Sequence, residues 1–205
     1  MTEGGDLEYA SRIAREVVLG LEAHGMKAAI GGAIAYGFWG TTRGTKDADI
    51  NVFIGEARFA ELQRVLEESG LGPVPGRATW SPEERAAFVS RCRDGSVAIA
   101  YKGDFRVDVF VPSIPFYDEA ERTLKRIRHP SGELVPVLSA EAICVFKLLF
   151  FRQKDLVDLA GLVARQGRAL DTAYVHRQLE IMFPEGDERL EEWDRIVRLH
   201  GPPSA

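Results

Sequence analysis

Two aspartates have a spacing that could support metal-dependent chemistry. Asp47 and Asp49 lie at the mouth of residues 49–54, a short apolar segment rich in β-branched residues that is typical of a strand. On a strand, residues i and i+2 point to the same face with Cα atoms about 6.5–7 Å apart, so the two carboxylates would repel each other unless a cation or hydrogen-bond donors lay between them. Paired carboxylates are hard oxygen ligands of the kind that hold Mg²⁺ beside substrate phosphates. The structural alternative is a pair of solvated charges at the end of a loop.

A third carboxylate, Asp108, lies in the middle of the sequence FRVDVFV, residues 105–111. An acidic residue is disfavoured within such a strand and is costly if it is buried without a partner. If this strand lies beside residues 49–54, three carboxylates converge, and such a cluster can hold two metal ions and activate a hydroxyl for in-line attack on a phosphoryl group. The alternative is a structural ion pair of Asp108 with Arg106 or Arg43.

A glycine pair precedes these acids and could position a phosphate. Residues 26–30 form a short, mostly apolar run typical of a buried strand, which ends in Gly31-Gly32, and a helix is predicted at once over residues 33–39. Glycines here let a ligand approach the backbone, and the helix N-terminus offers free N–H groups to an anion. A plain turn into a helix is the structural alternative.

The other predicted elements divide the chain into two parts. The predicted helices cover residues 7–25, 33–39, 56–69, 82–92, 139–151, 153–166, 171–183 and 187–199, and the predicted strands 26–30, 49–54, 97–101, 105–111 and 134–137. Ser81 and Glu84 have the spacing of a capping box, and Pro112 and Pro115 are expected to end the sheet. The pattern predicts an α+β protein, with a mixed first part to about residue 114 and a helical part from about residue 138.

Composition excludes several classes of protein. The 205 residues are 45% hydrophobic and 28% charged, which is enough apolar matter for a core and rules out wholesale disorder. A formal net charge of −5 excludes a generic nucleic-acid coater. Two cysteines without a paired spacing argue against a disulfide framework or a zinc ribbon. The polar N-terminus is unlike a signal peptide and no apolar stretch has the length of a membrane span, so we expect a cytoplasmic protein without a membrane partner.

Taken in order, the residues that could do chemistry resemble the nucleotidyltransferase superfamily of the DNA polymerase β type. Its signature is a Gly-Gly or Gly-Ser helix turn, a D-x-[DE] pair and a third acid on a later strand. The residues that carry the resemblance are Gly31, Gly32, Gly40, Arg43, Thr45, Asp47, Asp49 and Asp108. The stretch GGAIAYGFWGTTRGTKDAD is most similar to the AbiEii-like toxin branch, which also carries a lysine followed by a [KR]-D-x-x-D-L segment. Lys147 followed by KDLVDL at residues 154–159 is similar to that segment.

The resemblance implies a nucleotidyltransferase fold, in which a mixed sheet flanked by helices is followed by a C-terminal helical subdomain. Residues 1–114 would be the catalytic core, residues 115–205 a linker strand and the helical subdomain, and the active site would lie in the cleft between them. Asp47, Asp49 and Asp108 would be catalytic and hold Mg²⁺, with two ions expected, and Asp108 would also act on the attacking hydroxyl.

The resemblance also implies a set of nucleotide-binding residues. Gly31 and Gly32 would pack against the triphosphate, Arg43 and Thr45 would touch phosphate from the loop, and Lys147 would contact phosphate from the helical part, oriented by Asp155 or Asp158. The three residues of the helical part also have structural alternatives. Lys147 could be a snorkelling lysine beside a core helix. Asp155 and Asp158 could form salt bridges with Arg152, Lys154 or Arg165.

Members of the superfamily transfer a nucleoside monophosphate from an NTP and release pyrophosphate. Toxin members that resemble this chain act on RNA, typically the 3′ end of tRNA, and are neutralised by a cognate antitoxin. The resemblance therefore predicts a Mg²⁺-dependent nucleotidyltransferase toxin with an RNA acceptor. The alternatives are a nucleotidyltransferase for a small, antibiotic-type hydroxyl substrate and a catalytically inert relative that binds nucleotide or a partner. The basic run Arg122, Lys125, Arg126 and Arg128 fits a solvated helix face or a footprint for RNA phosphates.

Overall fold

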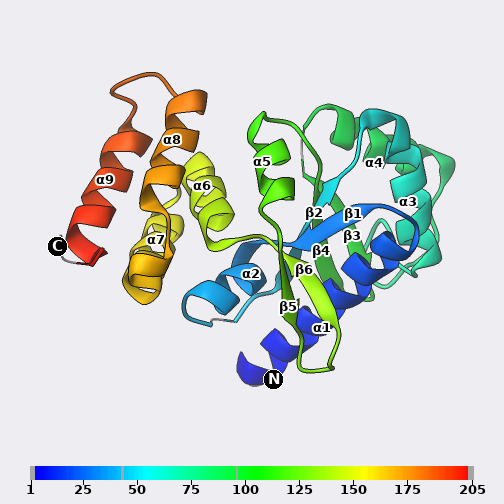
Figure 1. Ribbon diagram of the computed structural model, residues 1–205. Coiled ribbons are helices and arrows are strands. Elements are labelled where there is room, and N and C mark those ends of the chain that lie inside the picture. Colours follow the sequence, from blue (N-terminus) through cyan, green and yellow to red (C-terminus); the bar gives the residue numbers. More distant parts are fainter. Residues whose placement is uncertain (1–2, 43, 96, 203–205) are drawn as a thin grey trace.

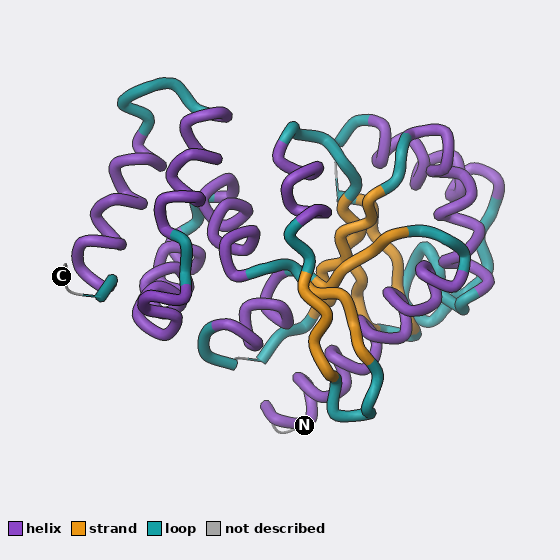
Figure 2. The backbone as a smooth tube through the Cα atoms, in the orientation of Figure 1, coloured by secondary structure: helices purple, strands orange, loops and turns teal. Residues whose placement is uncertain are grey.

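A mixed β-sheet of six strands runs through the middle of the computed structural model, which describes residues 3–42, 44–95 and 97–202. The strand order is β3-β4-β2-β1-β6-β5, and the tube in Figure 2 shows the strands gathered between two groups of helices. The strands are β1 (Lys27–Ile30), β2 (Asp47–Phe53), β3 (Ala98–Lys102), β4 (Phe105–Phe110), β5 (Lys125–Arg128) and β6 (Leu134–Val137). β2 runs antiparallel to β1 and parallel to β4.

Helices surround the sheet (Figure 1). They are α1 (Glu3–Ala23), α2 (Gly32–Trp39), α3 (Phe59–Glu68), α4 (Pro82–Arg93), α5 (Phe116–Arg122), α6 (Ala140–Phe150), α7 (Gln153–Gln166), α8 (Thr172–Met182) and α9 (Glu188–His200). Figure 1 shows α3 and α4 at one end of the molecule and α6–α9 at the other. Of the helices in the described part of the chain, none combines the length and apolar character that a membrane crossing requires.

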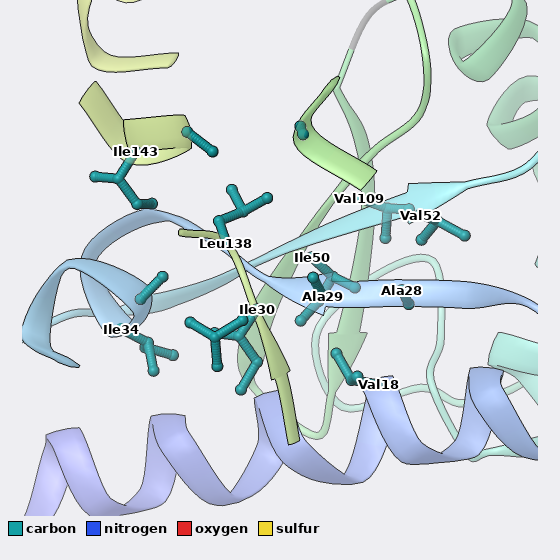
Figure 3. Packing of buried hydrophobic residues seen from close by; sticks show 14 of the residues in the cluster. Val18, Ala28, Ala29, Ile30, Ile34, Ile50, Val52, Val109, Leu138 and Ile143 are labelled. Atoms are coloured by element: carbon teal, nitrogen blue, oxygen red, sulfur yellow. The ribbon is translucent and has the colours of Figure 1, made fainter. Parts of the chain in front are cut away.

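The core forms where α1 and α2 cover the sheet. α1 buries one stripe at helical spacing, made of Ala10, Ile13, Ala14, Val17, Val18 and Leu21. In Figure 3, Val18 of α1 lies under β1, and Ile30, Ile34 and Leu138 meet where β1, α2 and the end of β6 converge. This packing fixes α2 against the end of β1 from which the glycine pair leads.

α2 joins the sheet to the C-terminal helices. It contacts β2 as well as α6 and α7. The indole Nε1 of Trp39 donates to the backbone oxygen of Leu138 at 2.8 Å, and the side chain of Gln166 in α7 donates to the backbone oxygen of Trp39. The helical part therefore packs directly on the element that carries the glycine pair.

Most predicted elements are present, and two elements between residues 115 and 130 are not as expected. The capping box is confirmed, because Ser81 accepts from the backbone of Glu84 and the Glu84 side chain accepts from the backbone of Ser81. The prediction that Pro112 and Pro115 end the sheet is wrong. β6 pairs with β1, and β5 pairs with β6, so the sheet continues past both prolines.

The basic run is also different from the helix face that was expected. Only Arg122 lies in a helix, α5, while Lys125, Arg126 and Arg128 belong to the edge strand β5. The three basic side chains of β5 are exposed. Charged residues, especially lysine, are the usual protection of an edge strand against further pairing, which gives this run a structural role.

Candidate active site

The pairing of β2 with β4 brings the three predicted aspartates together. The two strands are neighbours, as the convergence of the acids required, and Asp49 and Asp108 are direct partners in their parallel register. Asp47 lies two residues before Asp49 on the same face and is the register partner of Arg106. Three carboxylates and one guanidinium therefore share one face of the two interior strands β2 and β4.

The glycine pair seats the start of α2 directly on Asp49. The backbone N–H of Gly31 donates to the backbone oxygen of Asp49 at 2.8 Å. A Cβ atom on Gly32 would lie 1.6 Å from Asp49 Oδ2, and one on Gly31 would lie 2.3 Å from Asn51 Nδ2. Gly32 also has a φ of +52°, which L side chains rarely adopt. Gly32 is therefore required by both its φ and its packing, whereas a side chain at position 31 would displace the Asn51 amide.

The N-terminus of α2 keeps donors available beside this carboxylate. Gly31 is its N-cap residue and supplies no side-chain hydrogen bond to the helix. The first N–H groups of a helix have no partner within the helix, and the helix dipole makes this end favourable for an anion. Phosphate oxygens are suitable acceptors for such groups.

Asp49 lies in a strongly unfavourable electrostatic environment. Burial, followed by the negative charges of Asp47 and Asp108, raises its pKa from 3.8 to about 7, although Lys147 and Arg152 act in the opposite direction. Among the described residues, no hydrogen bond or ion pair holds the Asp49 side chain. A cation bound at this point would relieve the repulsion, so the acid pair has the electrostatic character of a cation site.

The other two aspartates have polar partners. Asp47 Oδ1 accepts from the hydroxyl of Thr45 at 2.7 Å, so the predicted nucleotide-binding residue Thr45 contacts an aspartate of the cluster. Asp108 accepts from Arg106 at both carboxylate oxygens, with Nε–Oδ1 at 2.6 Å and Nη2–Oδ2 at 3.0 Å. The hydrogen bond to Asp108 raises the pKa of Arg106. The ion pair with Arg106, one of the alternatives for Asp108, is therefore present.

A buried ionic cluster lies opposite, at the junction of α6 and α7. Lys147 is only 7% exposed, and its Nζ donates to Asp158 Oδ2 at 2.6 Å and to Asp155 Oδ1 at 3.2 Å. Arg152 Nε donates to Asp155 Oδ2 at 2.6 Å. Burial alone would raise the pKa of Asp155, but the hydrogen bonds and charges of Arg152 and Lys147 lower it. Asp155 has the salt bridge with Arg152 that was its structural alternative, while the contacts of Lys147 with Asp155 and Asp158 have the arrangement that the resemblance implied.

One cavity of about 480 Å³ separates the aspartate cluster from the ionic cluster. The predicted site residues that line it are Gly32, Thr45, Asp47, Asp49, Asp108, Lys147 and Asp155. Gly31 lies immediately before Gly32, and Arg43 lies outside the described residues. A larger cavity of about 850 Å³ lies between α1, α2 and residues 129–131, and none of the three aspartates lines it.

Several lining residues were not predicted as site residues from the sequence. Among them are Asn51, Arg106, Phe110, Phe150, Arg152 and Lys154. Asn51 could have been found, because it continues the two-residue spacing of Asp47 and Asp49 on the same face of β2. Phe110 likewise follows Asp108 at the same spacing. No comparable signal marked Phe150, which is 49% exposed at the end of α6.

The donor set suits a divalent cation, although its present arrangement does not form a complete metal site. Among the described His, Cys, Asp and Glu side chains, no group of three or more is arranged to hold a metal ion. Asp108 directs both oxygens to Arg106 instead, and Asp47 accepts from Thr45. The chemistry fits Mg²⁺, since all three donors are carboxylates on adjacent strands and the charges of Lys147 and Arg152 only partly offset the repulsion on Asp49. An ion held by all three aspartates would have to share the Asp108 carboxylate with Arg106 or displace it.

Comparison with known proteins supports the fold. The sequence matches no protein family model and no curated protein. The solved structure of ANT(2")-Ia in complex with adenylyl-2"-tobramycin is similar, with 16% identity, a TM-score of 0.52, and coverage of 92% of this chain and 98% of that chain. A nucleotidyltransferase-like protein from Paracoccidioides brasiliensis has 17% identity, a TM-score of 0.49, and coverage of 92% and 93%. The similarity to ANT(2")-Ia shows that the chain has a nucleotidyltransferase-like α+β fold.

Proposed function

We propose that the protein transfers a nucleoside monophosphate from an NTP to a hydroxyl group of a small acceptor molecule and releases pyrophosphate. One observation carries this function. The three aspartates of β2 and β4 and the N-terminus of α2 share a cavity with the cationic side chains of Lys147, Arg152 and Lys154. Carboxylates for a metal ion beside donors and cations for phosphate are the parts that phosphoryl-transfer chemistry requires.

Each part of the cavity has a distinct role in this reaction. The free N–H groups at the start of α2 would bind phosphate oxygens, and the absent side chain of Gly32 permits their close approach. Asp47, Asp49 and Asp108 would hold Mg²⁺, which neutralises triphosphate charge and lowers the pKa of the acceptor hydroxyl. The Asp108 carboxylate would accept the hydroxyl proton. The acceptor oxygen forms a bond to the α-phosphorus, and the bond from that phosphorus to the bridging oxygen breaks, so that pyrophosphate leaves with the electron pair.

A small acceptor is favoured over RNA by the basic run at the sheet edge. Arg126 forms a salt bridge with Glu22, and Arg122 forms one with Glu119. Those charges are partly compensated within the protein, which makes them poor counter-ions for a polynucleotide. The RNA acceptor, the toxin activity and the antitoxin rest on the resemblance to the AbiEii-like branch and stay predictions.

A transfer assay tests this function and its alternatives together. The protein is incubated with each α-labelled NTP and Mg²⁺, either with total tRNA or with a panel of hydroxyl compounds that includes tobramycin. We expect label on a small acceptor, none on RNA, and none with the Asp47→Ala/Asp49→Ala variant. Asp104→Ala is the matched control, because Asp104 is exposed in the β3–β4 turn outside the cavity. Label on tRNA would establish the RNA acceptor, and NTP binding without transfer to any acceptor would favour an inert relative.

A further inference from the structure

The ion pair between Arg106 and Asp108 lies within the aspartate cluster. Arg106 precedes Asp108 by two residues on β4, and its register partner on β2 is Asp47. Its guanidinium contacts both carboxylate oxygens of Asp108 through two different nitrogens, at 2.6 and 3.0 Å. Paired donors of this kind match a carboxylate in shape as well as in charge. The guanidinium therefore engages the same oxygens with which Asp108 would hold a metal ion.

The guanidinium and a divalent cation would repel each other if both bound the Asp108 carboxylate. Both are positively charged, and a hard cation coordinates carboxylate oxygens at about 2.0–2.6 Å. Bringing a cation of that kind beside a guanidinium already on those oxygens sets two positive charges against each other. Asp108 is 8% exposed, so solvent would screen that repulsion only weakly.

Arg106 has room to leave Asp108, and among the described cations of the cavity it is the one with a contact to that carboxylate. Its side chain is 43% exposed, so it can turn toward solvent when Asp108 changes partner. Lys147 is buried and held by Asp155 and Asp158 on the far side of the cavity. Arg152 pairs with Asp155 and not with the aspartate cluster. Lys154 is exposed and has no hydrogen bond or salt bridge with Asp108 among the described contacts, so Arg106 is the cavity cation that competes for this carboxylate.

We propose, relying on the proposed function only for the role of Asp108 as a metal ligand, that Arg106 is a positioning residue that competes with the divalent cation for Asp108. It thereby sets the metal concentration at which the site assembles. Binding of the ion releases the guanidinium from Asp108. Removing the guanidinium should then strengthen metal binding, whereas removing a true ligand weakens it.

Direct Mn²⁺ binding tests this role without any turnover. Free Mn²⁺ is followed by electron paramagnetic resonance during titration of the full-length protein, without nucleotide. We expect Arg106→Gln to bind Mn²⁺ about tenfold more tightly than wild type, which corresponds to about 1.4 kcal/mol. Arg152→Gln is the matched control, because Arg152 also lines the cavity and is 53% exposed but pairs with Asp155. Its loss should tighten binding by less than about twofold, because its charge acts only at a distance.

A double variant separates competition at Asp108 from a general change of charge. In the Asp108→Asn background, Arg106→Gln should tighten Mn²⁺ binding by no more than about twofold, since there is no carboxylate to compete for and only the loss of a nearby charge remains. Equal effects of Arg106→Gln and Arg152→Gln, or unchanged or weaker binding in Arg106→Gln, would overturn the proposal. So would an absence of Mn²⁺ binding in both wild type and Arg106→Gln. If Arg106→Gln fails to fold, Arg106→Lys replaces it, and it should tighten binding to a smaller extent because it keeps the charge and loses the paired contact.

The transfer assay on the same preparations keeps the two hypotheses distinguishable. Tighter Mn²⁺ binding by Arg106→Gln in a protein that transfers no nucleotide would support the role of Arg106 and refute the proposed function. If the protein transfers nucleotide but Arg106→Gln leaves Mn²⁺ binding unchanged, the proposed function is supported and the role of Arg106 is refuted.

Discussion

At the scale of single residues, Asp49 shows how the candidate site opposes the stability of the fold. Its carboxylate is partly buried beside Asp47 and Asp108, and this raises its pKa from 3.8 to about 7. Between these two values the folded protein holds a proton that the unfolded chain releases. The contribution of this group to stability is therefore fully present below about pH 4 and is lost as the pH rises through about 7.

Replacing this carboxylate with its neutral isostere should stabilise the protein at high pH. We expect Asp49→Asn to have a larger free energy of unfolding than wild type near pH 8, with the difference shrinking toward pH 4.5, where wild-type Asp49 is protonated for most of the time. Urea unfolding in the presence of EDTA measures this difference. Addition of Mg²⁺ near pH 8 should stabilise wild type more than the variant, because an ion that binds the folded state raises its stability. A difference that does not depend on pH would contradict the assigned environment of Asp49.

The packing of Gly32 leads to a second prediction at this scale. An Ala side chain there would require an unfavourable positive φ and would overlap Asp49 Oδ2. We expect Gly32→Ala to lower the free energy of unfolding by more than about 1 kcal/mol and to weaken Mn²⁺ binding, because the Asp49 carboxylate must move. Gly55→Ala is the control, since Gly55 has a φ of −76° and open space around its Cα. Equal stability of the two variants would show that α2 does not depend on this contact.

At the scale of elements, the α6–α7 junction is held by charges rather than by apolar packing alone. Lys147 is the buried cation shared by Asp155 and Asp158. Removing one partner from a buried ion cluster leaves uncompensated charge and is strongly destabilising. We therefore expect Lys147→Met to lower the free energy of unfolding by about 3 kcal/mol or more, measured by urea denaturation.

A neighbouring lysine supplies the control for this prediction. Lys154 is exposed at the start of α7, and Lys154→Met should change stability by no more than about 0.5 kcal/mol. A small effect of Lys147→Met would mean that the two aspartates find other partners. NTP affinity, measured on whichever variants fold, then reports whether Lys147 or Lys154 also contributes to nucleotide binding.

The sequence predicted those elements whose local patterns were unambiguous. Helical spacing and terminal signals placed α1, α3, α4 and the four C-terminal helices close to their observed bounds, because each has a clear apolar stripe or a cap. β5 was missed because KRIR has no apolar alternation, and its partner β6 alone makes it a strand. The short helix α5, between the prolines and β5, was missed as well. These two elements depend on tertiary contacts that no local pattern records.

The candidate site could likewise be predicted from the sequence only in part. The spacing of Asp47 and Asp49 and the odd position of Asp108 in an apolar strand were visible in the sequence, and the pairing of β2 with β4 was the condition that joined them. The sequence could not decide whether Asp108 joins a metal site or forms an ion pair with Arg106 or Arg43. The choice depends on the face that Arg106 shares with it and on the register that places Arg106 opposite Asp47. Register is a property of the assembled sheet.

At the scale of the whole molecule, the cavity couples two parts of the chain that are distant in sequence. One wall comes from the sheet and α2, and the other from the α6–α7 junction near Lys147. The division into a core to residue 114 and a helical part after it stays a prediction, and β5 and β6 now show that the sheet extends to Val137. A nucleotide bound between the two walls should therefore restrain both.

Hydrogen–deuterium exchange of the full chain tests this coupling. We expect ATP with Mg²⁺ to slow exchange in the segment from β1 into α2 and also in residues 147–158, because a ligand that contacts both walls must dissociate before either can open. α3 and α4 contribute no residue to the cavity and lie at the other end of the molecule from α6–α9 (Figure 1). Their exchange rates should not change, which makes them an internal control. The Asp47→Ala/Asp49→Ala variant should show no protection at either wall if the aspartates hold the metal–nucleotide complex. Protection confined to the sheet would place the nucleotide away from Lys147, and the cationic wall would then be a structural support for α6 and α7 rather than part of the binding site.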